Sequence, residues 1–200
     1  NQMNTEELLQ ATENLDTDNF ADILQQLPKK VLQEVLNSLR QQDRERVEQV
    51  LSYPEDTAGG LMNTDVVSIR PDLTIDAVLR YLRRHDTIPE MTDNLFVVTR
   101  KDNYIGLLPL TRLLVSDPNT LISDVMDTER EAITADLDET DVANLFERND
   151  WVSAPVINQE GRLVGRITID DVVDVIREEA DHSLMRMAGL DEDEDTFAPV

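Results

Sequence analysis

The sequence contains no cysteine and only two histidines among its 200 residues. The missing cysteine excludes a disulfide framework and any zinc or iron–sulfur site that needs thiolate ligands. Two histidines leave little room for a histidine-rich metal site. No apolar run approaches the roughly 18–20 residues that a membrane-spanning helix needs. The chain begins with Asn1 and ends with DTFAPV, so we expect it to be a piece of a longer protein.

Basic residues are also scarce, because 18 Lys and Arg stand against 42 Asp and Glu and the net charge is −24. Such a surface repels nucleic acid and anionic lipid, so we expect no nucleic-acid partner. It also repels itself unless cations or a basic partner neutralise it. Two interpretations therefore stay open, a surface that is merely soluble and a surface that responds to cations. Apolar residues make up 40% of the chain, which is enough to build a core.

Residues 5–52 have the pattern of helices only. One predicted helix ends at Pro28, and the next repeats apolar side chains at the three-and-four spacing of an amphipathic helix. A third ends before Pro54. Short helices separated by proline or polar turns predict a helical array, which we expect to be truncated at its N-terminus. The apolar faces consist of Val31, Leu32, Val35, Leu36 and Leu39, then Val47, Val50 and Leu51.

An internal repeat begins near residue 57. The stretch VVSIRPDLTIDAVLRYLRR, which starts at Val66, resembles REAITADLDETDVANLFER, which starts at Arg130, at an offset of 64 residues. A second pair follows at an offset of 59, LFVVTRKDNYIGLLPLTRLL from Leu95 and APVINQEGRLVGRITIDDVV from Ala154. The first copy therefore carries about five extra residues, within HDTIPEMTDN.

Each copy has the pattern of a short strand, a helix, a β-hairpin and a second helix. In the second copy Asp138 is the predicted N-cap of the first helix, and Asp141 lies in its first turn, where a carboxylate meets free backbone N–H groups. A module of about 60 residues is marginal alone, so we expect the copies to pack face to face. The predicted fold class is α+β, an all-helical N-terminal superhelical domain followed by two strand–helix–hairpin–helix modules.

These motifs resemble a known family. The tandem repeat with GRLVGRITIDD near the end of its second copy resembles a pair of cystathionine β-synthase (CBS) domains. The stretch YPEDTAGGLM after a helical array, with MAGLDEDED after the pair, resembles the cytosolic region of the MgtE magnesium transporters. The resemblance divides the chain into a helical N domain (1–56), a first CBS domain (57–126), a second CBS domain (127–181) and an acidic linker that begins a plug helix (182–200).

The resemblance implies a regulatory region and not an enzyme. Members of that family form homodimers, and the plug helix leads into a transmembrane pore, so this part lies on the cytoplasmic face of the cell (inner) membrane. Magnesium bound between the acidic cytosolic parts favours a compact, closed state, and loss of magnesium lets the acidic surfaces repel. Ions shift this balance only if they bind the compact state more tightly. We therefore expect a Mg²⁺-sensing region.

Spacing along the second copy's last helix suggests metal ligands. Asp170, Asp174 and Glu178 recur every four residues, so they share one helical face. Like charges at this spacing repel mildly unless a cation bridges them, and a solvated acidic face is the alternative. The resemblance implies Asp170 as a Mg²⁺ ligand.

The resemblance implies further ligands elsewhere. Glu160 in the NQEG turn is one, although Asn158 stands where that turn often has aspartate; an ordinary acidic turn is the alternative. Asp191 and Glu194 fall where plug-region ligands are expected, and an acidic linker is the alternative. Hard oxygen ligands suit Mg²⁺. The N domain should also contribute, from Asp43, Glu45, Glu48, Glu55 or Asp56.

A second ligand, an adenine nucleotide such as ATP or AMP, stays open. In CBS domains the pattern T-x-x-D at the hairpin-to-helix joint often holds an adenosine ribose, and the second copy has Thr168 and Asp171 there. The first copy has Pro109 and Arg112, so at most one such site remains in each chain. The alternative function is therefore a nucleotide-sensing module. Trp151 is expected to pack at a module seam, with stacking on adenine as its alternative role.

Overall fold

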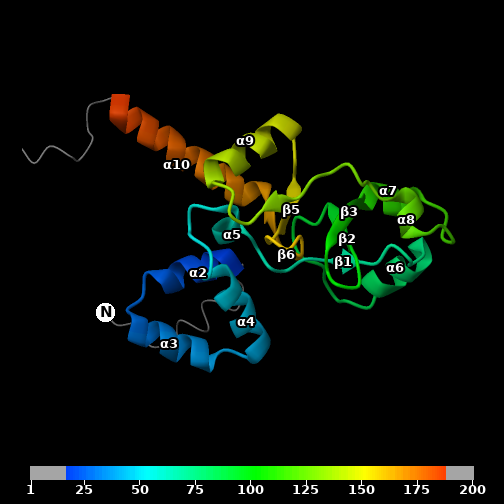
Figure 1. Ribbon diagram of the computed structural model, residues 1–200, viewed down its shortest axis with the longest axis horizontal. Helices are drawn as coiled ribbons and strands as arrows, with labels where there is room; N and C mark the ends of the chain where they lie inside the picture. Colours follow the sequence, from blue (N-terminus) through cyan, green and yellow to red (C-terminus); the bar gives the residue numbers. More distant parts are fainter. Residues whose placement is uncertain (1–16, 188–200) are drawn as a thin grey trace, which may run out of the picture.

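The structure is a computed structural model that describes residues 17–187. The N domain lies below the second repeat copy, and the first repeat copy lies beside the second at the right (Figure 1). The second copy therefore lies between the N domain and the first copy, although the first copy follows the N domain in the sequence. None of the described helices is long and apolar enough to cross a bilayer.

The described part of the N domain consists of short helices. They are α2 (Thr17–Gln25), α3 (Lys29–Ser38) and α4 (Gln41–Val50). Pro28 directly precedes α3, where its fixed φ suits the start of a helix. The predicted apolar face is confirmed, because its side chains surround a small core of Phe20, Leu24, Val35 and Val47.

The repeat copies have the predicted order of elements. The first consists of β1 (Ser68–Ile69), α6 (Ile75–Leu82), β2 (Asn94–Val98), β3 (Tyr104–Pro109) and α7 (Leu110–Val115). The second consists of β4 (Ile133–Thr134), α9 (Glu139–Asn149), β5 (Ser153–Ile157), β6 (Leu163–Thr168) and α10 (Ile169–Met187). In each sheet the first strand pairs parallel with the second, which pairs antiparallel with the third. The strand–helix–hairpin–helix prediction is confirmed.

Each copy is preceded by a short helix that packs on the other copy. The helix α8 (Ile122–Val125) precedes the second copy but joins the first, where the N–H of Ile122 donates to the carbonyl oxygen of Leu73 at 2.9 Å. The helix α5 (Ala58–Leu61) precedes the first copy but joins the second, where the N–H of Ala58 donates to Leu137 O at 2.7 Å. The segment that follows the N domain is therefore part of the second copy's packing.

The same helix-capping device starts the first helix in each copy. Thr74 Oγ1 accepts from the N–H of Ala77 at 3.2 Å, and Asp138 Oδ1 accepts from the N–H of Thr140 at 2.9 Å. The two caps are related by the offset of 64 residues. The prediction of Asp138 as an N-cap is therefore confirmed, and the cap fixes where α9 begins.

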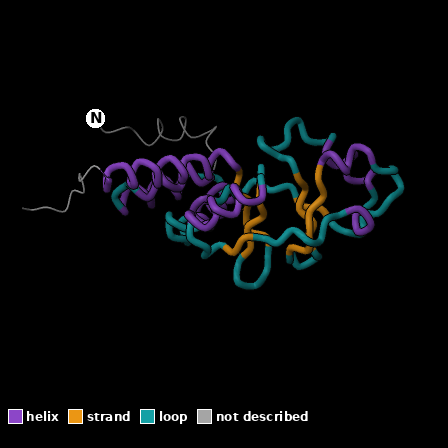
Figure 2. The backbone as a smooth tube through the Cα atoms, turned by 90° about the horizontal axis from the view of Figure 1, so that it is seen from above, coloured by secondary structure: helices purple, strands orange, loops and turns teal. Residues whose placement is uncertain are grey.

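The two sheets lie side by side in the middle of the pair of repeat copies, with helices on the outside (Figure 2). Their hairpin turns join, because the N–H of Tyr104 donates to Gly161 O at 3.0 Å and the N–H of Leu163 donates to Asp102 O at 2.9 Å. Burial raises the pKa of the Tyr104 phenol, whose hydroxyl donates to Arg130 O. These contacts hold the two copies as one body, as the predicted face-to-face packing requires.

A charged residue lies buried between the copies. Arg166 of β6 is 5% exposed, and its Nε lies 3.4 Å from Asp65 Oδ1 while Nη2 donates to Glu90 O at 2.6 Å. Its Nη1 has no hydrogen-bond partner within residues 17–187. The residue at the matching position of the first copy is Leu107. Arg166 therefore ties the second copy to two segments of the first at a position where an apolar residue also fits.

Candidate functional site

A pocket of about 440 Å³ lies where the N domain meets the second repeat copy. Its acidic lining comes from three parts of the chain: the end of the N domain, the first turn of α9 and the inner face of α10. The lining consists of Gln26, Glu55, Asp56, Gly60, Leu61, Glu139, Asp171, Asp174, Val175 and Glu178. Six of these ten residues are acidic and none is basic. The pocket is thus suited to a cation.

Glu139 is a carboxylate whose pKa this environment raises. The N–H of Glu139 donates to Asp56 O at 3.0 Å, which draws the end of the N domain onto the first turn of α9. Burial raises the pKa of Glu139, and the negative charges of Glu178, Asp138, Asp56 and Glu179 raise it further. Glu139 is therefore harder to ionise than a free glutamate, and a cation bound in the pocket would offset the surrounding negative charge.

The helix α10 supplies the other side of the pocket. Asp171, Asp174 and Glu178 follow one another at spacings of three and four residues, so their side chains share a helical face. Asp174 also lies 3.4 Å from Arg177 in an exposed ion pair. Asp170 is not among the lining residues, because one residue along a helix turns the side chain by about 100°. The structure thus brings Asp174 to the pocket together with Asp171, not with Asp170.

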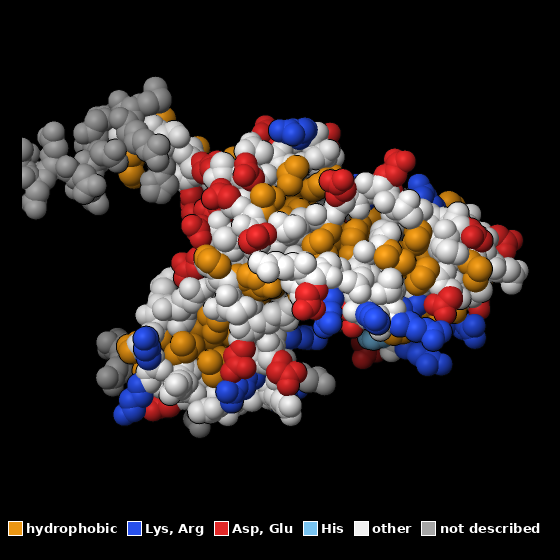
Figure 3. Space-filling model, viewed as in Figure 1, with side chains coloured by type: hydrophobic (Ala, Val, Ile, Leu, Met, Phe, Trp, Pro, Cys, Tyr) orange, Lys and Arg blue, Asp and Glu red, His pale blue; other side chains and the backbone are white. Residues whose placement is uncertain are grey.

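Acidic side chains gather beside α10 on the side that faces the N domain, whereas basic side chains lie along the lower edge of the first copy (Figure 3). The sequence has the same asymmetry. Residues 127–187 hold sixteen acidic and six basic side chains, against nine and seven in residues 57–126. The negative charge of the described chain is therefore concentrated around the second copy.

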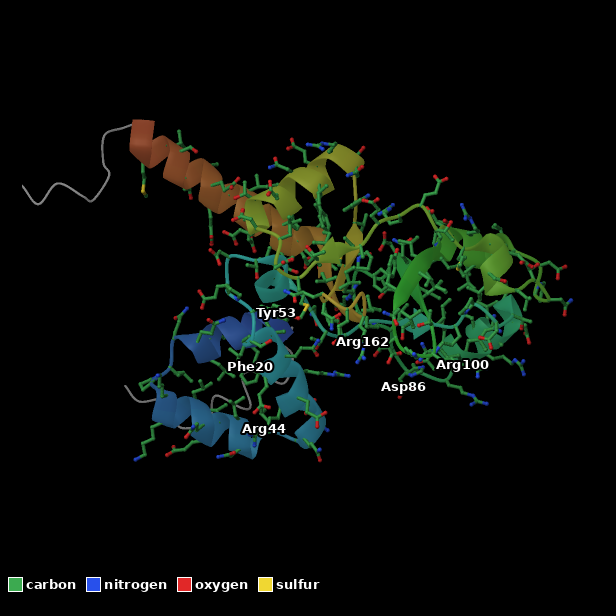
Figure 4. The ribbon with its side chains drawn as sticks, viewed as in Figure 1. Phe20, Arg44, Tyr53, Asp86, Arg100 and Arg162 are labelled. Atoms are coloured by element: carbon green, nitrogen blue, oxygen red, sulfur yellow. The ribbon has the colours of Figure 1, made fainter. Side chains whose placement is uncertain are left out.

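Glu160 lies in a different place. It lines a separate pocket of about 340 Å³ with Tyr53, Ala135, Asp136, Asn158 and Gln159. Its carboxylate lies 3.1 Å from Arg162 Nε. Asn158 accepts from the N–H groups of both Glu160 and Arg162 at 3.0 Å, so its side chain shapes the turn. Figure 4 shows Tyr53 and Arg162 on the two sides of this region.

The joint between β6 and α10 holds the residues predicted for a ribose. Thr168 Oγ1 donates to Asp170 Oδ1 and lies 3.2 Å from Asp171 Oδ2. Thr168 and both aspartates are therefore adjacent. In the first copy Arg112 Nη1 instead donates to Val125 O at 2.8 Å. The carboxylate that a ribose would need is thus replaced by a guanidinium there.

Trp151 packs against two side chains of its own copy, so the predicted packing role is confirmed but the predicted place at a module seam is not. Its ring lies edge-on to Phe146 at 5.7 Å between centroids, and the guanidinium of Arg130 lies 4.8 Å from the ring centroid. One face of the indole is therefore covered by Arg130. Stacking on an adenine would have to use the rest of its surface.

The carboxylates do not form a ready-made metal cage in the part of the chain that the structure describes, since no three His, Cys, Asp or Glu side chains there are grouped to hold an ion. Their oxygen-only chemistry nevertheless fits a hard cation that keeps several waters and needs one or two carboxylates. Asp191 and Glu194 lie outside the described residues.

Glu139 was not predicted as a site residue from the sequence, and Glu55 and Asp56 could not be ranked above other N-domain acids. No local pattern marks them, because they meet through a backbone bond between residues 83 positions apart. The sequence offers only one indication of the site, the many acidic residues in and around the segments that contain Asp56 and Glu139.

Residues 1–56 match the family model of the MgtE intracellular N domain, and residues 58–117 and 122–178 match that of the CBS domain. The magnesium transporter MgtE of Thermus thermophilus is 36% identical over 177 residues, which are 87% of this chain and 39% of that protein. MgtE of Bacillus subtilis is 30% identical over 184 residues, which are 92% and 41%. The chain thus spans about two-fifths of these curated relatives.

Two solved structures are similar along most of the chain. The cytosolic domain of the Mg²⁺ channel MgtE in complex with ATP has a TM-score of 0.80 and 36% identity, over 86% of this chain and 71% of that one. The soluble part of a magnesium transporter has a TM-score of 0.80 and 29% identity, over 88% and 67%.

Fold and matches together define a class, a CBS-domain pair joined to a helical N domain. Within that class the chain belongs to the MgtE family, and it corresponds to the cytosolic region of its members. The predicted family and fold class are confirmed.

Proposed function

We propose that this chain is the Mg²⁺-sensing regulatory region of a magnesium transporter or channel, and that it is not itself an enzyme. The observation that carries this proposal is the acidic pocket between the N domain and the second CBS copy. Its carboxylates come from separate domains, so a cation there would hold the domains together. The names of the relatives, which are magnesium transporters, support Mg²⁺ as the cation.

The mechanism is electrostatic. Without a cation the carboxylates of Asp56, Glu139 and Glu178 repel one another across the domain boundary, and this repulsion adds to burial in raising the pKa of Glu139. Mg²⁺ between them removes the repulsion and favours the compact arrangement. The ion shifts the population only by its preference for the compact state, and about 5.5 kcal/mol of preference takes a two-state balance from 1:99 to 99:1.

Several ligand assignments are part of this proposal. Asp174 lines the acidic pocket, and Glu160 lines the neighbouring pocket together with Tyr53. Because Asp170 does not line the acidic pocket, it could be a ligand only for an ion on another side of α10, beside Thr168. Asp191 and Glu194 would contribute from the chain beyond α10.

We further propose that the chain acts as a homodimer and that a pore-forming part follows it in the whole protein, with this region on the cytoplasmic face of the membrane. The dimer is supported by two exposed apolar side chains on α7, Leu114 and Val115, which are 73% and 83% exposed. The pore is supported by the greater length of the magnesium transporters that the chain matches.

The test is small-angle X-ray scattering of this chain, titrated with MgCl₂ from zero to tens of millimolar against KCl of matched ionic strength. The expected result is a saturable fall in the radius of gyration with Mg²⁺ only. The same contraction in KCl would mean charge screening without a site. The double substitution Asp174→Asn with Glu178→Gln should raise the Mg²⁺ concentration at half-contraction. The matched control, Glu147→Gln on α9 with Asp150→Asn at the C-cap of that helix, should not.

A second function, adenine-nucleotide sensing, is supported by one arrangement. Thr168 and Asp171 are adjacent at the joint where CBS domains hold ribose, and the similar cytosolic domain of MgtE was solved with ATP. Asp171 also lines the acidic pocket, so the two functions would share this residue at the start of α10. Calorimetric titration with ATP and AMP in EDTA would separate them, because the nucleotide site needs no metal to bind the ribose.

A further inference from the structure

The last turn of the N domain packs closely against α5. We call residues 53–60, which contain this contact, the junction. Gly59 and Gly60 are buried there. A Cβ on Gly59 would lie 2.7 Å from Tyr53 Cβ and closer still to Tyr53 Cγ. A Cβ on Gly60 would lie 2.5 Å from the carbonyl oxygens of both Pro54 and Glu55. Any other residue at either position would therefore force the junction to move.

The helix α8, which is the counterpart of α5, indicates why α5 has glycine at these two positions. The helix α8 holds the equivalent position in the first copy, with Ser123 and Asp124 where α5 has Gly59 and Gly60. Neither glycine is among the positive-φ glycines of the described chain, which are Gly106 and Gly161. Since the same short helix forms with side chains at these positions, the glycines serve the close contact with the N domain and not the backbone conformation of α5.

The junction also lies between the two pockets. Tyr53 lines the pocket that contains Glu160, and Glu55, Asp56 and Gly60 line the acidic pocket. The N–H of Gly59 donates to Ala135 O at 2.8 Å, which anchors α5 on the second copy. A shift of Tyr53–Glu55 away from α5 would therefore move the N-domain carboxylates away from those of α9 and α10.

We propose that Gly59 and Gly60 are positioning residues for cation binding: their missing side chains let the N domain sit close enough to the second CBS copy for Asp56 and Glu139 to share one ion. This inference rests on the proposed Mg²⁺ function for its consequence, but its steric part stands without it. The pocket carboxylates supply the negative charge, and the two glycines set the distance between the N domain and the second CBS copy.

The first test measures Mg²⁺-dependent contraction of the chain by small-angle scattering. Gly59→Ala should raise the Mg²⁺ concentration at half-contraction by roughly tenfold or more, because the compact state is overpacked while every carboxylate is kept. Ser123→Ala in α8 is the matched control and should leave the midpoint within about twofold of the unsubstituted chain. An unchanged midpoint in Gly59→Ala would overturn the inference.

Rescue by a second substitution separates a specific contact from a general loss of folding. Tyr53→Gly removes all three atoms that a Cβ on Gly59 would strike, so Tyr53→Gly with Gly59→Ala should recover most of the lost Mg²⁺ response. The same Tyr53→Gly should not rescue Gly60→Ala, whose obstacle is the backbone of Pro54 and Glu55. Equal rescue of both, or of neither, would contradict the proposed contact.

A double-mutant cycle in EDTA keeps the two proposals distinguishable. Urea unfolding of the four chains that combine Tyr53→Gly and Gly59→Ala should give coupled changes in midpoint, whereas Tyr53→Gly and Ser123→Ala should be additive. If the unsubstituted chain fails to contract with Mg²⁺ but the coupling is present, the Mg²⁺ function fails and the steric contact stands. If the coupling is absent, the inference fails whatever Mg²⁺ does.

Discussion

The backbone N–H of Glu139 donates to the carbonyl oxygen of Asp56 at 3.0 Å, and this bond brings carboxylates of two domains to one pocket. The bond is formed by the backbone, so it persists whether or not the side chains are charged. The two carboxylates are therefore held near each other by geometry, against their own repulsion. Conditions that neutralise them should favour the compact state.

Replacing Glu139 by glutamine should make the chain more compact when no divalent cation is present. The substitution keeps the size of the side chain and removes a charge that Glu178, Asp138 and Asp56 oppose. We expect a smaller radius of gyration in EDTA at pH 7.5 and a weaker response to added Mg²⁺. Glu147→Gln, an exposed residue of the same helix, should have neither effect; if both variants contract equally, net charge alone is responsible.

The stability of the chain should depend on pH through the same residue. The pKa of Glu139 is raised above its ordinary value of 4.5, so the folded state binds a proton at a higher pH than the unfolded chain does. Stability therefore rises as pH falls through the raised pKa, and this gain is complete below the ordinary value. Thermal unfolding in EDTA from pH 8 to pH 5 should give a larger rise in midpoint for the unsubstituted chain than for Glu139→Gln. Parallel curves would exclude Glu139 as the group responsible.

Arg166 should be replaceable by leucine at lower cost than by alanine. Alanine leaves Asp65 without its guanidinium and creates a void between the sheets, which we expect to cost roughly 1–3 kcal/mol of unfolding free energy. Leucine fills the volume as Leu107 does in the first copy. Urea unfolding of both variants measures the difference, with the exposed Arg177→Leu as control; a leucine variant as unstable as the alanine variant would mean that the ionic contacts dominate.

Thr168→Val should weaken nucleotide binding. The substitution keeps the shape of the side chain and removes the hydroxyl beside Asp171, so one lost hydrogen bond should reduce ATP affinity about five- to tenfold. Calorimetry in EDTA gives the affinity, and Thr111→Val on the first copy's α7 is the control. Unchanged ATP affinity would remove Thr168 from the site.

Much of the fold could be predicted because it depends on local or repeated patterns. Asp138 caps a helix as predicted, and Thr74, its counterpart at the offset of 64 residues, caps the matching helix of the first copy. The apolar face around Val35 follows from helical spacing. Such features need only neighbouring residues, so a single sequence contains them.

The candidate site was less predictable because it depends on distant contacts and on helix phase. The face of Asp170, Asp174 and Glu178 follows from spacing, but the observed pocket takes Asp171 instead of Asp170. Glu139 joins it only because α5 carries the N domain to the second copy. Periodicity shows which side chains share a helical face, but only the packing of the helix decides what that face contacts.

The helix α10 runs without a break from Ile169 to Met187. Its first turns carry acidic side chains of the pocket, and at 1.5 Å per residue its 19 residues extend about 28 Å. A rigid rod of this length is a lever arm: a tilt of about 10° at the pocket would carry its far end through about 5 Å. Small movements of a few carboxylates at the pocket would thus displace the C-terminal end of α10 by about the length of one helical turn.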